Sequence, residues 1–123
     1  MTENELTYQI KGAIWDVYNA LGPGLLESVY EEALCYELTL RGLKVERQKL
    51  VPITYKGMMI KTDLRLDLVV EDSIIIELKS VEELKPVFFK QIKTYLKLTN
   101  KHLGLLVNFG ENDMKEGIHR IIL

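Results

Sequence analysis

Two neighbouring segments carry carboxylates and a lysine at a spacing that suits metal-dependent chemistry. Asp63–Val70 and Ile74–Lys79 both have the apolar, β-branched pattern of strands, and a short polar break separates them. Side chains alternate between the two faces of a strand. Asp67 on the first strand and Glu77 on the second can therefore share a face. Lys79, two residues after Glu77, lies on that face as well.

The register of the two strands follows from burial. If Val70 pairs with Ile74, Asp67 lies opposite Glu77, and a slip by one residue would mix the polar and apolar faces. This register predicts a three-residue connection, Glu71–Ser73. It also predicts one continuous apolar face, made of Leu64, Leu66, Leu68 and Val70 from the first strand and Ile74, Ile76 and Leu78 from the second.

Two carboxylates placed side by side destabilise a sheet unless something compensates their charge. A hard divalent cation does so, because Mg²⁺ binds one or two carboxylates together with water and phosphate oxygens. Lys79 could then stabilise charge that grows on a phosphate. The competing interpretation is an ion-pair cluster in which Arg65 and Lys79 neutralise Asp67 and Glu77. Spacing alone leaves both interpretations open.

Three motifs together resemble a known family. Asp67 followed by Glu77–Lys79 resembles the PD-(D/E)xK nuclease signature, and Gln91–Tyr95 is similar to the QxxxY element of RecB-like nuclease domains. Upstream, Gly24–Tyr30 resembles the motif that names the GxxExxY family of that superfamily. The likeness runs from about residue 22 to residue 110. Each motif is weak alone, and their order makes the combination specific.

The resemblance implies a restriction-endonuclease-like fold and a Mg²⁺- or Mn²⁺-dependent nuclease that hydrolyses phosphodiester bonds with a metal-activated water. The implied partner is nucleic acid, with DNA favoured. The implied metal ligands are Asp67, Glu77 and the carbonyl of Leu78, and the implied catalytic residues are Glu27, Asp67, Glu77, Lys79 and Gln91. We assign substrate binding to Tyr95 and, from the charged face of the same helix, to Lys90, Lys93 and Lys97.

The match to the signature has two departures, and one of them keeps a second function class open. Leu66 stands where the signature has proline, which is a common and harmless variation. Phe88 and Phe89 precede Gln91 where a more polar stretch is expected. The alternative is a catalytically silent module with the nuclease fold, or a subunit of a larger nucleic-acid-processing complex. The Phe88–Phe89 pair and the net charge of −2 favour this alternative. The intact set of Asp67, Glu77 and Lys79 favours the nuclease.

Several of these residues also have ordinary structural interpretations. Glu27 would be stabilised in the first turn of a helix by the helix dipole. Tyr30 fits a core position, and Gln91 needs hydrogen-bond partners if it is buried. The lysines of residues 90–97 form one face of a helix. Such a face is usually only solvated, and in the remaining cases it contacts phosphates.

The periodicity of the apolar residues predicts the elements that position this site. Helices are expected at residues 5–20, 26–41 and 86–98, and strands at 45–55, 60–71, 74–80, 103–108 and 118–123. The order α-α-β-β-β-α-β-β indicates an α/β fold, in which a β-meander and a right-handed β-α-β crossover form a mixed sheet flanked by helices. Pro52 indicates a strand at or near the sheet edge.

Length and composition bound the remaining possibilities. The chain has 123 residues and 47% apolar residues, which predicts one domain over residues 1–123. A single cysteine, Cys35, predicts a reducing, cytoplasmic setting, and together with two histidines it is too few ligands for zinc. No apolar run is long enough for a membrane span. Trp15 and Tyr18 fit a core or an oligomer contact, so a homodimer or a partner protein stays open.

Charge is distributed unevenly along the chain. Residues 1–42 carry a net charge of −5, and residues 79–102 carry +4. One end of the molecule could therefore meet phosphates although the whole is acidic.

Overall fold

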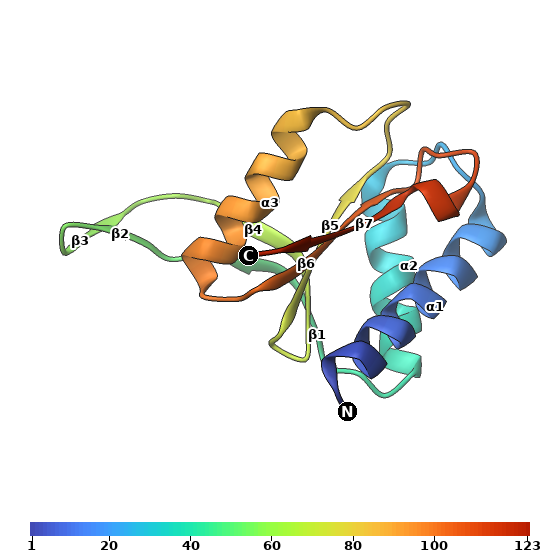
Figure 1. The fold of residues 1–123 in the computed structure, drawn as a ribbon, viewed down its shortest axis with the longest axis horizontal. Helices are drawn as coiled ribbons and strands as arrows, with labels where there is room; N and C mark the ends of the chain where they lie inside the picture. Colours follow the sequence, from blue (N-terminus) through green and yellow to red (C-terminus); the bar gives the residue numbers. More distant parts are fainter.

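Figure 1 shows the computed structural model, which describes all 123 residues and places helices on both sides of a five-stranded sheet. The helices are α1 (Glu3–Leu21), α2 (Glu27–Leu40), α3 (Pro86–Thr99) and the short 3₁₀ helix η1 (Met114–Glu116). The strands are β1 (Val45–Leu50), β2 (Ile53–Tyr55), β3 (Met58–Ile60), β4 (Arg65–Val70), β5 (Ile74–Lys79), β6 (Leu103–Asn108) and β7 (Ile118–Ile122). The main sheet has the order β1-β4-β5-β6-β7, and β2 and β3 form a separate hairpin.

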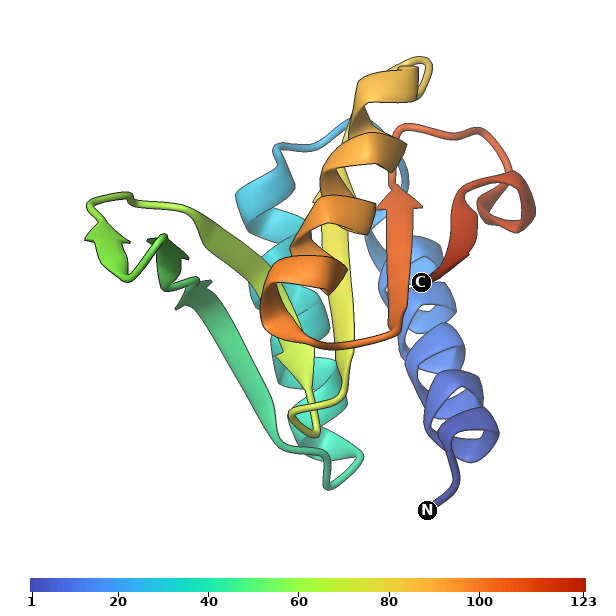
Figure 2. The same ribbon diagram turned by 60° about the vertical axis from the view of Figure 1, so that its left-hand side comes forward.

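The sheet separates two apolar cores. Helices α1 and α2 pack on one face and α3 on the other, as the turned view in Figure 2 shows. The larger core, here the α1/α2 core, contains Ile10, Ile14, Leu34, Leu68 and Ile76 among its buried residues. The smaller core, here the α3 core, consists of Val51, Leu66, Val69, Ile75 and Leu96. No helix combines the length and the apolar character that a membrane span requires.

The helix ends follow local sequence signals. The Oγ1 of Thr2 accepts a hydrogen bond from the backbone N–H of Glu5 at 3.1 Å and caps α1. Pro86 occupies the first turn of α3, where no hydrogen-bonded N–H is needed. Asn100 ends α3 in the left-handed conformation. These signals explain why the predicted helices agree with the observed ones to within two residues.

The predicted topology of the main sheet is confirmed. β1, β4 and β5 form an antiparallel meander, and β5 and β6 pair in parallel across α3. The predicted register of β4 and β5 is also confirmed, because Leu68 pairs with Ile76 and Val70 with Ile74. The connection is Glu71–Ser73, as predicted. β1 lies at the edge of the sheet, as Pro52 indicated.

The predicted strands at residues 45–55 and 60–71 are too long. The first is broken after Leu50, and Pro52 follows the break because it has no N–H for the ladder. The chain then forms the β2–β3 hairpin around Lys56 and Gly57 before β4 begins at Arg65. Two further strands and η1 therefore join the predicted order of elements.

The predicted continuous apolar face is wrong at its far end. Leu66 belongs to the α3 core together with Val69, whereas Leu68 belongs to the α1/α2 core. Strict alternation would put Leu66 and Leu68 on one face, so the strand changes face around Asp67. Asp67 has no partner in the ladder with β1 or with β5, and this interruption is what allows the change.

Tyr30 is a core residue, in agreement with its structural interpretation. Its ring stacks on Phe109 at a centroid distance of 4.2 Å and is fully buried. Its hydroxyl donates to the carbonyl of Gly22 at 2.5 Å and accepts from the N–H of Leu25 at 3.0 Å. Tyr30 therefore fixes the loop that leads into α2.

The Tyr30→Phe variant should be less stable than the parent protein by about 1–2 kcal/mol, because Phe keeps the stacking but leaves a buried N–H and a carbonyl without this partner. Urea denaturation followed by circular dichroism measures the difference. Tyr36→Phe is the matched control, since Tyr36 is exposed and its hydroxyl makes no hydrogen bond. Equal stability of Tyr30→Phe and Tyr36→Phe would contradict the role of the Tyr30 hydroxyl.

Candidate active site

A pocket of about 160 Å³ lies where β4 begins and β5 ends, on the side of the sheet that α3 covers. It is lined by Glu27, Arg65, Asp67, Glu77, Leu78, Lys79, Phe88, Gln91, Ile92, Tyr95 and Leu106. The five side chains for which the sequence predicts a catalytic role all line it, together with Tyr95. They come from α2, β4, β5 and α3, so the pocket exists only in the folded chain.

Asp67 and Glu77 are held by each other's backbone. The N–H of Asp67 donates to Oε2 of Glu77 at 3.0 Å, and the N–H of Leu78 donates to Oδ2 of Asp67 at 2.9 Å. These side-chain bonds replace the ladder bonds that a regular sheet would have there, and the β4–β5 ladder ends at the pair Leu68–Ile76. The two carboxylates are thereby fixed next to each other inside the pocket.

The ion-pair interpretation of the site is wrong. Neither Asp67 nor Glu77 forms a salt bridge with any basic side chain. Arg65 donates instead to the backbone carbonyl of Gln48 at 3.1 Å. The Nζ of Lys79 lies over the ring of Phe88, 4.3 Å from its centroid. The two acids are therefore without an ion-pair partner, and the charge of Lys79 only partly offsets the rise in the pKa of Glu77.

Burial makes the pair of acids costly. Glu77 is only 8% exposed, and burial together with the charge of Asp67 raises the pKa of its carboxyl to about 9. Burial also raises the pKa of the Tyr95 hydroxyl, and the charges of Glu77 and Asp67 add to the effect. A bound cation would lower both of these pKa values.

The donor set fits a hard divalent cation. No three His, Cys, Asp or Glu side chains lie close enough together to hold a metal by themselves. The second oxygen of Glu77 accepts no hydrogen bond from the protein, and the Oδ1 of Asp67 accepts only a long one, 3.4 Å from the amide of Gln48. Carboxylate oxygens of this kind, completed by water or phosphate oxygens, are what Mg²⁺ binds. Asp67 and Glu77 would hold the ion, with the carbonyl of Leu78 as a third ligand.

Glu27 reaches the pocket from α2, of which it is the first residue. Its Oε1 accepts a hydrogen bond from the N–H of Ser80 at 3.3 Å, and the hydroxyl of Ser80 donates to the carbonyl of Leu25 at 2.6 Å. These two bonds tie the start of α2 to the end of β5, directly after Lys79. Glu27 therefore lies in the first turn of α2, as its structural interpretation predicts, and it also lines the pocket.

Gln91 and Tyr95 line the pocket, but Lys90, Lys93 and Lys97 do not. On a helix, residues 91 and 95 are neighbours along one face, and the three lysines project from another. All three lysines are exposed, and none has an acidic partner. The lysine face of α3 is therefore separate from the pocket, although the sequence pattern predicted that both belong to one site.

Phe88 and Phe89 have different environments. Phe88 lines the pocket and contacts Lys79, whereas the ring of Phe89 meets His119 edge to face at a centroid distance of 5.3 Å. Only the first of the two aromatic residues is part of the site.

Sequence reasoning missed Asn108, which fixes the chain after Lys79. Asn108 is fully buried at the end of β6. Its Oδ1 accepts from the N–H of Val81 at 3.0 Å and of Gly110 at 2.9 Å, and its Nδ2 donates to the carbonyl of Val81 at 2.9 Å. A polar residue at the end of a wholly apolar strand was the available signal.

A second missed group supports Asp67 from the β1 side. Glu31 is buried on α2 and accepts hydrogen bonds from Arg47 at 3.2 Å and from the amide of Gln48 at 2.5 Å. Gln48 has a positive φ of 49°, which places its amide between Glu31 and Asp67. No local sequence signal indicates a left-handed glutamine within a strand.

The buried acid makes a testable prediction. In the presence of a chelator, the Glu77→Gln variant should be more stable than the parent by about 2 kcal/mol near pH 8, because the amide can keep the hydrogen bond from the N–H of Asp67 and, unlike the carboxylate, does not have to take up a proton on folding. Below pH 4.5 the carboxyl of Glu77 is protonated in both the folded and the unfolded state, so it does not lower the stability. Between pH 4.5 and 9 the folded state keeps the proton and the unfolded state loses it, so the loss of stability grows with pH. Denaturation at several pH values should therefore show a gain that increases with pH.

The exposed Glu82→Gln variant is the control, since Glu82 has no hydrogen bond or ion pair. A gain of equal size in Glu82→Gln, or a gain at Glu77→Gln that shrinks with rising pH, would contradict the burial argument.

The fold and the pocket define a nuclease-like α/β protein, with paired acids and a lysine on adjacent strands. The sequence matches the family model of the PD-(D/E)XK nuclease superfamily over residues 4–121. The chain therefore belongs to the PD-(D/E)XK nuclease superfamily, and its mixed sheet flanked by helices is the restriction-endonuclease-like fold. Membership implies nucleic acid as the partner, and nucleases of this superfamily generally use divalent metals. No curated protein and no solved structure matches the chain.

Proposed function

We propose that this protein is a Mg²⁺- or Mn²⁺-dependent nuclease that hydrolyses phosphodiester bonds, with DNA as its substrate. The observation that carries the proposal is the pair Asp67 and Glu77, which the backbone holds together in a pocket where neither acid forms a salt bridge. A structural role would not require two acids to lie side by side in a pocket, because neighbouring like charges destabilise a sheet.

A divalent cation at this pair would supply Lewis-acid stabilisation of the phosphate and would lower the pKa of a water. The protein contributes fixed positions for the two acids through the N–H groups of Asp67 and Leu78. The ammonium group of Lys79 has no carboxylate partner, so its charge is available to a phosphate oxygen. Arg65 lines the same pocket and is unpaired as well.

Glu27, Gln91 and Tyr95 complete the polar wall of the pocket. Gln91 is exposed and presents both a donor and an acceptor to a bound nucleotide. Glu27 is a third acid near the pair, positioned by Ser80. We assign these three residues to substrate positioning around the reacting phosphate.

We also place the chain in the GxxExxY family, because each residue of that motif has a physical role here. Gly24 has a positive φ of 92° in the loop before α2. Glu27 lines the pocket, and Tyr30 holds the loop through its hydroxyl. The free thiol of Cys35 supports a cytoplasmic location.

One observation favours a catalytically silent module instead. The ring of Phe88 covers the ammonium group of Lys79 and would compete with a phosphate for it. In that case the fold would bind nucleic acid or a partner protein without cleaving it.

The test incubates labelled duplex DNA, single-stranded DNA and RNA with the parent protein and with Asp67→Asn, in Mg²⁺, in Mn²⁺ and in chelator. We expect metal-dependent cleavage that Asp67→Asn loses by more than about 10²-fold. Asp63→Asn is the matched control, because Asp63 is exposed and lies outside the pocket. If both variants cleave like the parent, another site or a contaminant is responsible. If folded parent protein cleaves nothing, the silent module is the correct function.

A further inference from the structure

The β2–β3 hairpin projects from the body of the protein, as both Figure 1 and Figure 2 show. Its base is closed by the N–H of Val51, which donates to the carbonyl of Leu64 at 2.8 Å. Its tip is the two-residue turn Lys56–Gly57, in which both φ angles are positive, as a type I′ turn requires. The hairpin is therefore a regular two-stranded ribbon that is anchored at one end only.

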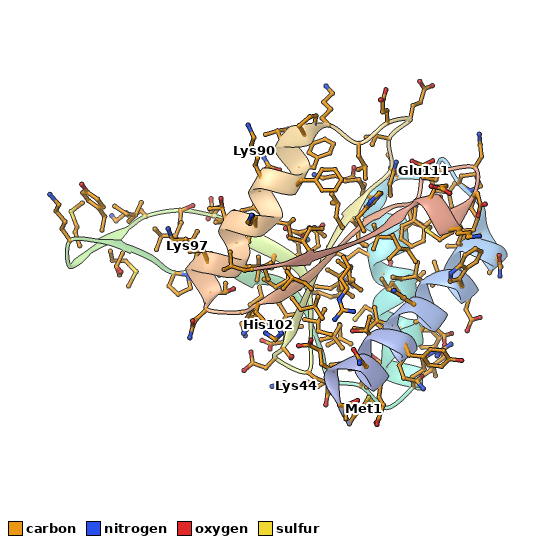
Figure 3. All side chains as sticks on the ribbon, viewed as in Figure 1. Met1, Lys44, Lys90, Lys97, His102 and Glu111 are labelled. Atoms are coloured by element: carbon orange, nitrogen blue, oxygen red, sulfur yellow. The ribbon has the colours of Figure 1, made fainter.

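The ribbon exposes large apolar side chains. Tyr55, Met58 and Met59 are 62%, 62% and 63% exposed, and none of them belongs to either core. Figure 3 shows side chains extending from this ribbon into solvent on both of its sides. Exposed apolar side chains grouped in this way indicate a binding surface.

The ribbon begins beside the pocket. β4 starts at Arg65, directly after the hairpin, and Arg65 lines the pocket with Asp67. β4 therefore runs from the base of the hairpin into the site within three residues. A molecule held along the hairpin would reach the paired acids without crossing the rest of the sheet.

The charges of the hairpin fit a polyanion. Lys56, Lys61 and Arg65 have no acidic partner, whereas Lys49 in β1 and Lys101, which precedes β6, are paired with Asp72. The Nζ of Lys56 instead lies 5.5 Å from the centroid of the Tyr55 ring. The unpaired cations thus follow the ribbon from its tip to the pocket.

We propose that the β2–β3 hairpin is an arm that inserts into a groove of duplex nucleic acid and holds it against the pocket. A two-stranded ribbon fits the major groove, lysines beside it meet the phosphates, and exposed methionines contact the bases. The proposal rests on the proposed function for the identity of its substrate, but not on cleavage. It assigns to residues 53–61 the contacts with nucleic acid that were expected of the lysine face of α3.

The test measures binding of a short labelled duplex and of a single strand of the same sequence by fluorescence anisotropy, in chelator and at several salt concentrations. We expect Lys56→Ala/Lys61→Ala to weaken duplex binding by about 10-fold and to lower the salt slope by about 2, since each phosphate contact contributes about 0.9. Met58→Ala/Met59→Ala should weaken duplex binding and leave the salt slope unchanged. All these side chains lie outside both cores, so the variants should fold.

Lys11→Ala/Lys115→Ala is the control with the same change in charge, because both lysines are unpaired and lie on α1 and η1. The proposal is overturned if the hairpin and control variants bind duplex equally, or if the single strand loses as much affinity as the duplex. It is also overturned if Met58→Ala/Met59→Ala changes only the oligomeric mass in light scattering.

A second readout separates this proposal from the proposed function. Hydrolysis of the small diester bis(p-nitrophenyl) phosphate with Mn²⁺ should be unchanged in the hairpin variants, because the diester reaches the pocket without the arm. If the parent hydrolyses neither substrate while the hairpin variants still lose duplex binding, the nuclease proposal fails and the arm stands. If the diester is hydrolysed and duplex binding is unchanged in the variants, the arm fails and the nuclease stands.

Discussion

Replacing Lys79 by alanine is expected to lower the rate of Mg²⁺-dependent cleavage by about 10³-fold, the size of effect typical for the loss of one charged group that stabilises a transition state. Lys79 is the one ammonium group in the pocket, and it has no carboxylate partner that could take over its charge. Initial rates of duplex cleavage, measured with the parent and the variant side by side, give the ratio.

The same variant should keep its affinity for the metal. Asp67 and Glu77 are positioned by the N–H groups of Asp67 and Leu78, so the side chain of Lys79 is not needed to hold them. A metal-induced rise in melting temperature should therefore persist in Lys79→Ala and disappear in Asp67→Asn. Lys90→Ala is the control for charge, since Lys90 lies on α3 outside the pocket. Loss of metal binding in Lys79→Ala would show that Lys79 acts on the acids and not on the substrate.

The Asn108→Ala variant should lose about 3 kcal/mol of stability, because the change leaves two N–H donors and one carbonyl of partly buried residues without partners and opens a cavity at a fully buried side chain. The side chain of Asn108 connects the end of β6 to Val81 and to Gly110. The N–H of Phe109 donates to the carbonyl of Lys79 at 2.8 Å, so the same segment also sets the backbone position of Lys79. Cleavage should fall more than the loss of folded protein accounts for.

Urea denaturation and cleavage rates under conditions where the variant is fully folded separate the two effects. Asn112→Ala is the matched control, because Asn112 is exposed and makes no side-chain hydrogen bond. Asn108→Asp keeps the acceptor oxygens but not the donor to Val81, and it should be destabilised as well. A loss below about 1 kcal/mol in Asn108→Ala would contradict the argument from buried polar groups.

Gly110, two residues after Asn108, cannot be replaced by a larger residue without a steric clash. A Cβ at this position would lie 2.1 Å from the carbonyl oxygen of Val81, which is backbone and cannot move aside cheaply. The chain from Lys79 to Val81 and the chain from Asn108 to Gly110 thus pack backbone to backbone. This close approach explains why a glycine follows the buried residue Phe109.

Local patterns in the sequence determined most of the main sheet and its helices. The apolar period of the helices, the stop signals at Gly22 and Asn100 and the alternation after Leu68 depend only on neighbouring residues. The register of β4 and β5 was predictable because burial of Leu68 and Ile76 excludes the alternative pairings.

The composition of the site was also predictable from the sequence, but its interactions were not. The sequence placed Asp67, Glu77 and Lys79 on adjacent strands, and the structure brings them into one pocket. Arg65 and Lys79 form no salt bridge with the acids because their side chains point elsewhere. Those directions are set by Gln48 on β1 and Phe88 on α3, which are distant in sequence.

Only the tertiary structure decided the irregular parts. Leu66 changes face because the carboxylates of Asp67 and Glu77 take over hydrogen bonds of the ladder, and regular alternation cannot anticipate this. Asn108 acquires its role from a loop that lies 27 residues away in the chain. Periodicity reports which side chains must be buried, because burial repeats with the helix and strand period. It does not report which buried polar groups meet, because those contacts form between segments that the chain brings together only when it folds.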